Sequence, residues 1–351
     1  MFSMRMKSMT ALGLASLFML LLGACAEGDG GGGGNEAQDQ TEEPSGDSAA
    51  EANITSVDTL VMGLVASESE QESDGAEERL AEELSDELGG VPVEIEEFET
   101  HNSALRAVDA GDAHLLMTTA LRIAEAEEGA GAAAILQSVR NGESVHVAQW
   151  FTNDPHTYCE ERPVADEAGY LFCNGIYDEE TGQRAEYGPV GAEALENIPD
   201  GSSVTYVDEG LAATYFFPQT QIDALGTEVD ARFAGDQAQS VLDVYHGEVA
   251  VGTSGIDARR QVVEDTPDVG EEVVVFAWAG PIPNPGIIAS DVLSEEEHQV
   301  ITEALLAIAG DEDLGEGDPL YDVYGIHGLT EPNEESLEFA REVYENFGDR
   351  P

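Results

Sequence analysis

Small and hydroxyl-bearing residues stand at four places where a predicted strand gives way to a predicted helix. They are Ser67 with Ser69, Thr118 with Thr119, Ala212 and Ala213 with Thr214, and Ser254. The first amides of a helix lack an intrahelical partner and lie at the positive end of its dipole, so such a junction can bind an anion through its backbone. Helix starts favour Ser and Thr for capping alone, but four such ends in one chain favour a polar pocket.

Arg122 is the side chain that we expect to select the ligand. It lies one turn into the helix that begins after Thr118 and Thr119. An arginine fork takes an oxyanion through two hydrogen bonds, and a local positive centre is valuable in an acidic chain if the ligand is an anion. The alternative is a surface arginine paired with Glu125, three residues further along the same helix, a contact worth only a few tenths of a kcal/mol.

Predicted strands and helices alternate along the chain. The apolar run from Thr59 to Val65 is typical of a parallel strand that is covered on both faces. Further strands are predicted at 91–98, 113–117, 135–139, 204–207, 229–233, 248–253 and 273–278, with an extended segment at 145–151 and a rigid connector at 280–285. Helices are predicted around 80–88, 105–108 and 119–122, from 211, at 240–245, from 257, and at 295–309 and 334–347. This alternation predicts an α/β protein with open, mostly parallel sheets and a ligand beyond the carboxyl ends of the strands.

The amino-terminal region has the pattern of a leader followed by a tether. The apolar run from Met9 to Ala24 is shorter than the roughly 20 residues that a spanning helix needs, and with the basic residues before it has the form of a signal peptide over residues 1–24. Its end, Leu22 to Cys25, resembles the lipobox of bacterial lipoproteins, which implies cleavage before Cys25 and lipidation of that residue; a plain signal peptide with a chance cysteine is the alternative. Residues 25–56 are rich in Gly, Glu, Asp and Ser, which predicts a disordered tether.

Two further cysteines, Cys159 and Cys173, lie in an irregular stretch from 153 to 199. In an oxidising compartment we expect them to pair and to close a loop for roughly 3 kcal/mol of stability. A metal site is not favoured, because two thiols without a nearby His/Cys pair supply only half a ligand set.

The charge of the chain is extreme. Against 13 Lys and Arg stand 73 Asp and Glu among 351 residues, a formal net charge of −60. Such a surface repels nucleic acid and anionic lipid. Its self-repulsion is largely removed where the Debye length falls to about 3 Å near 1 M salt, which favours a saline habitat over an ordinary acidic exported protein.

Motifs of enzymes are absent from the sequence. It contains no Gly-x-Ser-x-Gly elbow, no His-Glu-x-x-His and no Walker loop, and its seven histidines are scattered. Trp150, Trp278, Tyr215 and Phe216 could line a cleft, with core packing as the alternative. We therefore expect a binding protein without catalytic residues, cofactor or metal.

Several segments resemble the phosphate/phosphite/phosphonate-binding proteins of ABC transporters. They are Leu60 to Glu72, Tyr206 to Pro218, Tyr245 to Arg259, and Ile282-Pro283-Asn284, in the order and spacing of that family. The resemblance covers roughly residues 57–310 and implies the type II periplasmic-binding fold, two α/β lobes around a cleft that closes on the ligand. It places lobe one at 57–153 plus 281–351 and lobe two at 154–280.

The residues implied to bind ligand depart from the family pattern. Where the family has a Ser-Thr-Ser-Gly run, this chain has Leu211-Ala212-Ala213-Thr214, with Tyr215 next. Family tyrosines align with Asn102 and Arg122 and a frequent histidine aligns with Gln237, whereas the acidic residue is kept at Asp257. Each lost charge-assisted hydrogen bond is worth about 1.5–3 kcal/mol, so the fold and the transport role carry over better than the ligand.

The resemblance implies a monomeric, lipid-anchored protein on the outer face of the cytoplasmic membrane. It would capture a small, phosphonate-like or other oxyanion and deliver it to an ABC permease. The alternatives are a lipoprotein that presents a sensory or adhesive domain, and an importer component for a neutral or cationic ligand.

Overall fold

The computed structural model describes residues 54–65, 75–255, 257–310 and 313–348. The predicted signal peptide, Cys25, nearly all of the tether, and Ser67 lie outside these ranges. All of the described residues belong to one compact unit, 49–351.

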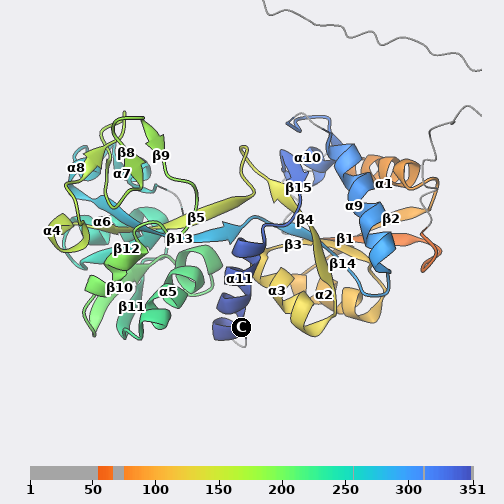
Figure 1. Ribbon diagram of the computed structural model, residues 1–351, viewed down its shortest axis with the longest axis horizontal. Coiled ribbons are helices and arrows are strands. Elements are labelled where there is room, and N and C mark those ends of the chain that lie inside the picture. Colours follow the sequence, from red (N-terminus) through yellow and green to blue (C-terminus); the bar gives the residue numbers. More distant parts are fainter. Residues whose placement is uncertain (1–53, 66–74, 256, 311–312, 349–351) are drawn as a thin grey trace, which may run out of the picture. The chain divides into compact units, whose positions relative to one another are not determined.

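Six strands form the first sheet, in the order β15-β4-β14-β3-β1-β2 (Figure 1). They are β1 (Leu60–Val65), β2 (Val93–Phe98), β3 (Leu115–Thr118), β4 (Ala133–Val139), β14 (Gly286–Ala289) and β15 (Gly328–Thr330). β1 pairs in parallel with β2 and β3, and β14 lies antiparallel between β3 and β4. β4 therefore runs in the direction of β1 to β3, and only β14 and β15 of this sheet are reversed.

Helices cover both faces of this sheet because each carries an apolar stripe. On one face lie α1 (Ala76–Glu87), α9 (Glu295–Ala309) and α10 (Pro319–Tyr324), and on the other α2 (His101–Ala110) and α3 (Ala120–Gly129). Leu80 and Leu84 of α1 are fully buried against the first face. α9 begins at a capping box, in which the Ser294 hydroxyl and the Glu297 carboxylate bond each other's backbone amides.

Seven strands form the second sheet, in the order β11-β10-β12-β5-β13-β7-β6. They are β5 (Val145–Thr152), β6 (Val164–Ala165), β7 (Leu171–Phe172), β10 (Ser202–Tyr206), β11 (Val229–Phe233), β12 (Val251–Ser254) and β13 (Val274–Pro283); β8 (Tyr177–Asp178) pairs separately with β9 (Gln183–Arg184). β10 is parallel to β11 and β12, whereas β5 is antiparallel to β12 and β13. Five α-helices and a 3₁₀ turn among the described residues complete this lobe. They are α4 (Pro155–Tyr158), α5 (Phe217–Leu225), α6 (Gln237–Tyr245), α7 (Arg259–Val262), α8 (Val269–Glu272) and the 3₁₀ turn (Ala192–Asn197).

Two sequence predictions differ from the observed elements. The boundary at residue 153 groups β5 with lobe one, but its hydrogen-bonded neighbours β12 and β13 belong to the second sheet. The predicted connector at 280–285 is largely the end of β13, which continues to Pro283 through shifts of register opposite β5. Both differences arise because β5 and β13 are stabilised by each other, a pairing of segments about 130 residues apart that local pattern does not reveal.

The last helix, α11 (Glu334–Phe347), packs into both lobes. Its Leu337 lies in a core of the first lobe, whereas Ala340, Val343 and Phe347 lie in a core of the second. Arg341 also bonds Glu127 of α3 through Nε, at 2.8 Å.

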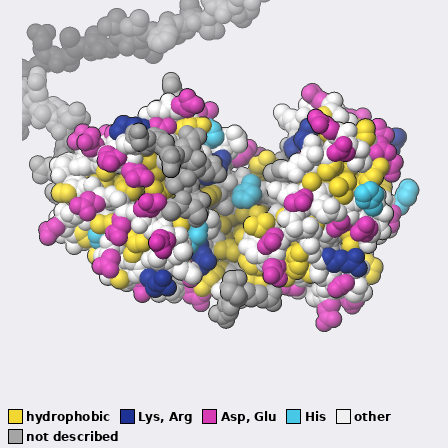
Figure 2. Space-filling model, turned by 180° about the vertical axis from the view of Figure 1, so that it is seen from behind, with side chains coloured by type: hydrophobic (Ala, Val, Ile, Leu, Met, Phe, Trp, Pro, Cys, Tyr) yellow, Lys and Arg dark blue, Asp and Glu magenta, His cyan; other side chains and the backbone are white. Residues whose placement is uncertain are grey.

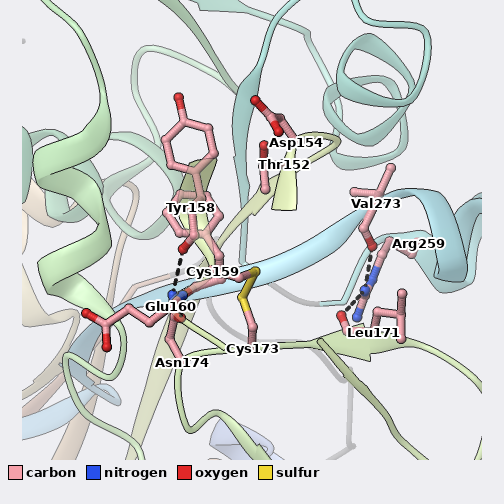
Figure 3. Close-up of a disulfide and its surroundings, with 11 residues drawn as sticks. Thr152, Asp154, Tyr158, Cys159, Glu160, Leu171, Cys173, Asn174, Arg259 and Val273 are labelled. Atoms are coloured by element: carbon pink, nitrogen blue, oxygen red, sulfur yellow. Dashed lines mark hydrogen bonds between the residues drawn. A yellow bond between two sulfur atoms is a disulfide. The ribbon is translucent and has the colours of Figure 1, made fainter. Parts of the chain in front are cut away.

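A disulfide joins Cys159 and Cys173, as predicted (Figure 3). Beside it, the Asn174 amide donates to the carbonyls of Tyr158 and Phe276 and accepts from the Glu160 amide. The link therefore fixes the segment after α4 to β7 and to the central strand β13.

Candidate ligand-binding site

A cavity of about 520 Å³ lies where the tight turn between β4 and β5 meets β13 and the loop after β12. Its walls carry Arg140, Glu143, His146, Gln149, Arg184, Tyr187, Gly255, Asp257, Trp278 and Asn284, with Asn141, Val145, Val147 and Pro285. Polar and aromatic side chains converging on one concave space are typical of small-ligand sites.

Arg140 reaches the cavity from the tight turn between β4 and β5. Asn141 and Gly142 both have positive φ, 54° and 82°, and Arg140 and Glu143 exchange both backbone hydrogen bonds across them. Asn-Gly is the dipeptide that such two-residue turns prefer. The Asn-Gly pair between two predicted strands was the sequence signal for this turn, and our sequence analysis missed it.

His146 presents a defined tautomer to the cavity. The Asn284 amide nitrogen donates to the carbonyls of Ser138 and Glu143, which leaves its oxygen to face His146 Nδ1 at 3.1 Å. Nδ1 must therefore donate. Burial lowers the pKa of His146. The hydrogen bond to Asn284 acts in the opposite direction, and the nearby Arg140 charge lowers the pKa further. The lowered pKa favours the neutral ring, in which Nε2 is an acceptor.

Two N–H groups in the cavity wall have no acceptor within the described residues. They are Arg140 Nε and Trp278 Nε1, and both atoms are buried; Gln149 Oε1, opposite Trp278 in the register of β5 and β13, is likewise buried without a partner. Trp278 is fully buried, and only 6% of Gln149 is exposed. A buried polar group left unsatisfied costs about 1–3 kcal/mol, so this wall favours a guest that accepts hydrogen bonds.

The carboxylate of Asp257 is already occupied. Arg259 binds it through both nitrogens, Nε to Oδ1 at 2.7 Å and Nη2 to Oδ2 at 2.9 Å. Arg184, across the cavity, is only loosely paired, 3.8 Å from Asp166. Glu143 is exposed to solvent. The charges that remain effective in the cavity are therefore mainly the guanidinium groups of Arg140 and Arg184.

The ligand-binding residues predicted from the sequence lie in several different parts of the structure. Thr119, Arg122 and Ala212 line a smaller cavity of about 190 Å³, together with Glu125 and the end of α11. Arg122 forms an ion pair with Glu125 there, which is the alternative weighed in the sequence analysis. The role of Arg122 in ligand binding stays a prediction.

Other predicted residues lie near the end of β12. Gln237 Oε1 accepts from the Gly255 amide at 3.0 Å. Thr214 is buried, with no hydrogen-bond partner for its hydroxyl among the described residues, and its methyl lies against Gly255. These two residues and Asp257 are thus brought together beside the larger cavity.

The remaining predicted residues do not line the larger cavity. Thr118 is buried at the end of β3, where its hydroxyl faces His101 Nδ1 at 3.3 Å, and Asn102 is exposed on α2. Ala213 packs against the core of the second lobe. Tyr215 sits in an aromatic cluster with Tyr206, Phe216 and Phe233, in a π-helix (Ala212–Phe216) where sequence predicted the start of a regular helix.

The residues that the structure describes contain no group of three or more His, Cys, Asp or Glu that could hold a metal ion. No helix among them is both long enough and apolar enough to cross a membrane. Acidic side chains are scattered over the face shown in Figure 2, with few basic side chains between them.

Two α/β lobes joined by paired crossing strands, with a polar cavity beside those strands, define a solute-binding protein of the type II periplasmic-binding fold. The family model for the periplasmic substrate-binding proteins of phosphonate ABC transporters matches residues 62–337. The chain belongs to this family, as the sequence resemblance predicted.

Two solved structures of one Xanthomonas citri protein share the fold at low sequence identity. A Xanthomonas citri protein bound to ATP is 14% identical, with a TM-score of 0.52 over 84% of this chain and 100% of that chain. The same protein bound to chloride gives 13% and 0.51 over 82% and 98%. PhnD1 from Prochlorococcus marinus, in complex with methylphosphonate, is 12% identical, with a TM-score of 0.43 over 83% and 98%. No curated protein sequence matches the chain significantly.

Proposed function

We propose that this protein captures a small oxyanion of the phosphonate type in the 520 Å³ cavity and delivers it to an ABC permease. The proposal assigns the ligand to the wall formed by β5, β13 and the tight turn between β4 and β5. It makes Arg140 and Trp278, rather than Arg122, the main donors to the anion.

The observation that carries the proposal is the pair of unpartnered donors. Arginine Nε and indole Nε1 can only donate, and both are buried in one cavity wall. Both atoms are covered by neighbouring atoms of the wall, so a phosphonate or phosphite oxygen, which accepts several hydrogen bonds, would satisfy them after the side chains of the wall shift. A neutral His146 adds an acceptor for the hydroxyl of a singly protonated ligand.

The electrostatics of the cavity favour the same class of ligand. Arg140 and Arg184 supply positive charge, and Arg259 offsets the charge of Asp257 at close range. The chain has a net charge of −60, so its surface repels anions. A positively charged pocket is therefore needed if an anion is to be concentrated at the protein.

The test is calorimetric titration of the purified mature protein with methylphosphonate, phosphite, phosphate and methylsulfonate. Arg140→Gln is expected to weaken the best of these by about 10- to 100-fold, which corresponds to the loss of one charge-assisted hydrogen bond. The matched control is Arg122→Gln, which removes the same charge from the smaller cavity and is expected to leave the affinity within about twofold. The reverse pattern would assign the ligand to the smaller cavity, and binding of none of the four anions would refute the proposal.

We further propose that the domain is held at the outer face of the cytoplasmic membrane by lipid on Cys25. The support is the Leu22 to Cys25 motif after a short apolar run and membership of a family that works with membrane permeases. A mature protein without lipid on Cys25, found by mass spectrometry, would refute the anchor but leave the ligand proposal standing.

A further inference from the structure

We infer that the cavity selects oxyanions without a positively charged substituent, because Arg259 occupies the one buried carboxylate in its wall. The inference rests on the proposed function and narrows it to a ligand class. It would take alkyl or unsubstituted phosphonates and reject zwitterionic aminoalkyl phosphonates.

Asp257 is the acidic residue to which an ammonium group would be expected to bind. It lines the cavity, and 6% of its side chain is exposed. Yet each of its two oxygens accepts from a different nitrogen of Arg259, and Arg260 Nε lies 3.8 Å from Oδ2. An ammonium group arriving at this carboxylate would meet an arginine already bound to both oxygens.

Arg259 is itself held so firmly that it cannot yield Asp257 to a ligand without breaking other bonds. Only 1% of its side chain is exposed. Its Nη1 donates to the carbonyls of Leu171, at 2.8 Å, and Val273, at 2.7 Å, as Figure 3 shows beside the disulfide. Its guanidinium also lies over the rings of Tyr170 and Phe172, at 5.1 and 4.7 Å.

The rest of the wall offers an ammonium group little compensation. Arg140 and Arg184 repel it, and Trp278 Nε1 is a donor. Glu143 is exposed, so its attraction is screened by solvent. Gln149 Oε1 is one neutral acceptor, whereas an ammonium group has three hydrogens to place. The exposed Tyr187 ring, 5.6 Å from the buried Trp278 ring, instead provides apolar surface for an alkyl substituent.

The decisive comparison is between propylphosphonate and aminoethylphosphonate, which differ by a methyl group in place of an ammonium group. For the wild-type protein, titration calorimetry should give an affinity at least about tenfold higher for propylphosphonate, because burying an unpaired ammonium group is costly. Tighter binding of aminoethylphosphonate would overturn the inference while leaving the proposed function in place. Binding of neither probe would refute this inference, whereas the proposed function would still be decided by the titration with the four smaller anions.

Asp257→Asn tests whether Arg259 is the cause. The variant leaves the positive charge of Arg259 facing the cavity, so both phosphonates should bind about two- to tenfold tighter and the ratio of their affinities should stay the same. Asp230→Asn, the same change at an exposed site on β11, is the control for net charge. If Asp257→Asn instead weakens aminoethylphosphonate selectively, Asp257 is an ammonium ligand and the inference is wrong. If the variant fails to fold, the ratio of the wild-type affinities for propylphosphonate and aminoethylphosphonate decides whether the inference holds.

Discussion

The two tryptophans of the chain offer a matched test of the cavity wall. Both are fully buried, but Trp150 Nε1 donates to Gln221 Oε1 at 2.8 Å, whereas Trp278 Nε1 has no acceptor among the described residues. Replacing either by Phe removes a similar volume and one N–H group. The difference between the two variants therefore isolates the hydrogen bond.

In the absence of ligand, Trp150→Phe should be the more destabilising variant. It strands Gln221 Oε1, although the Gln221 amide keeps its bond to the Trp278 carbonyl, at 3.1 Å. Trp278→Phe leaves no acceptor without its hydrogen bond, and it removes a buried donor that is unsatisfied in the wild type. With a lost hydrogen bond and a stranded group each worth about 1–3 kcal/mol, we expect the free energies of unfolding to differ by about 1–3 kcal/mol in favour of Trp278→Phe.

Ligand affinity should change in the opposite order. Trp278→Phe removes a donor to the anion and should weaken methylphosphonate by about 10- to 100-fold, whereas Trp150→Phe, on the other face of the sheet, should not change it. Urea denaturation of the ligand-free proteins and titration calorimetry measure the two effects. Equal destabilisation together with unchanged affinity in both variants would show that the Trp278 N–H is not a ligand donor.

Three further predictions follow from single contacts. Burial alone would raise the pKa of Glu297, but hydrogen bonds from Ser56, Ser294 and Thr55 outweigh burial and hold the pKa far below its ordinary value. Glu297→Gln should therefore lower the free energy of unfolding by about 2–4 kcal/mol at pH 7. In denaturation curves, this difference between variant and wild type should narrow below pH 4.5, where the carboxylate of the unfolded wild type takes up protons. Cys159→Ser should lower the stability by about 3 kcal/mol, and equal midpoints for wild type under reducing and non-reducing conditions would contradict it. Cys25→Ser should abolish lipidation and cleavage after Ala24, and retention of both, by mass spectrometry, would count against the lipobox.

The sequence pattern predicted most elements of the fold because they are locally encoded. The strand at 229–233 and the helices at 295–309 and 334–347 agree with β11, α9 and α11, since each has its own apolar periodicity, and the two longer helices have capping residues at Ser294 and Asn333. The short strands β6 to β9 and β15 were missed, because two or three residues are too few to carry a period.

The candidate site was predicted less well. Of its wall, Asp257 was named in advance as a ligand-binding residue through the family resemblance, Trp278 was named as an aromatic residue that could line a cleft, and Asn284 was named only as part of a segment that resembles the family. Arg140, Arg184 and Trp278 come from segments that are adjacent only after β5 has paired with β13, so no local motif unites them. The donors that matter were also invisible in principle, because the lack of a hydrogen-bond partner is a property of the folded environment and not of the residue type.

The last helix has a practical consequence for engineering the protein. Since α11 (Glu334–Phe347) contributes Leu337 to one core and Phe347 to the other, a truncation before residue 334 would expose apolar surface on both lobes and remove a physical link between them. Phe347 stacks on Phe216 at 4.8 Å, within the π-helix beside the smaller cavity. A reporter or immobilisation tag fused directly after this helix would therefore press on both lobes, and a biosensor built from this protein is better attached through the amino-terminal segment.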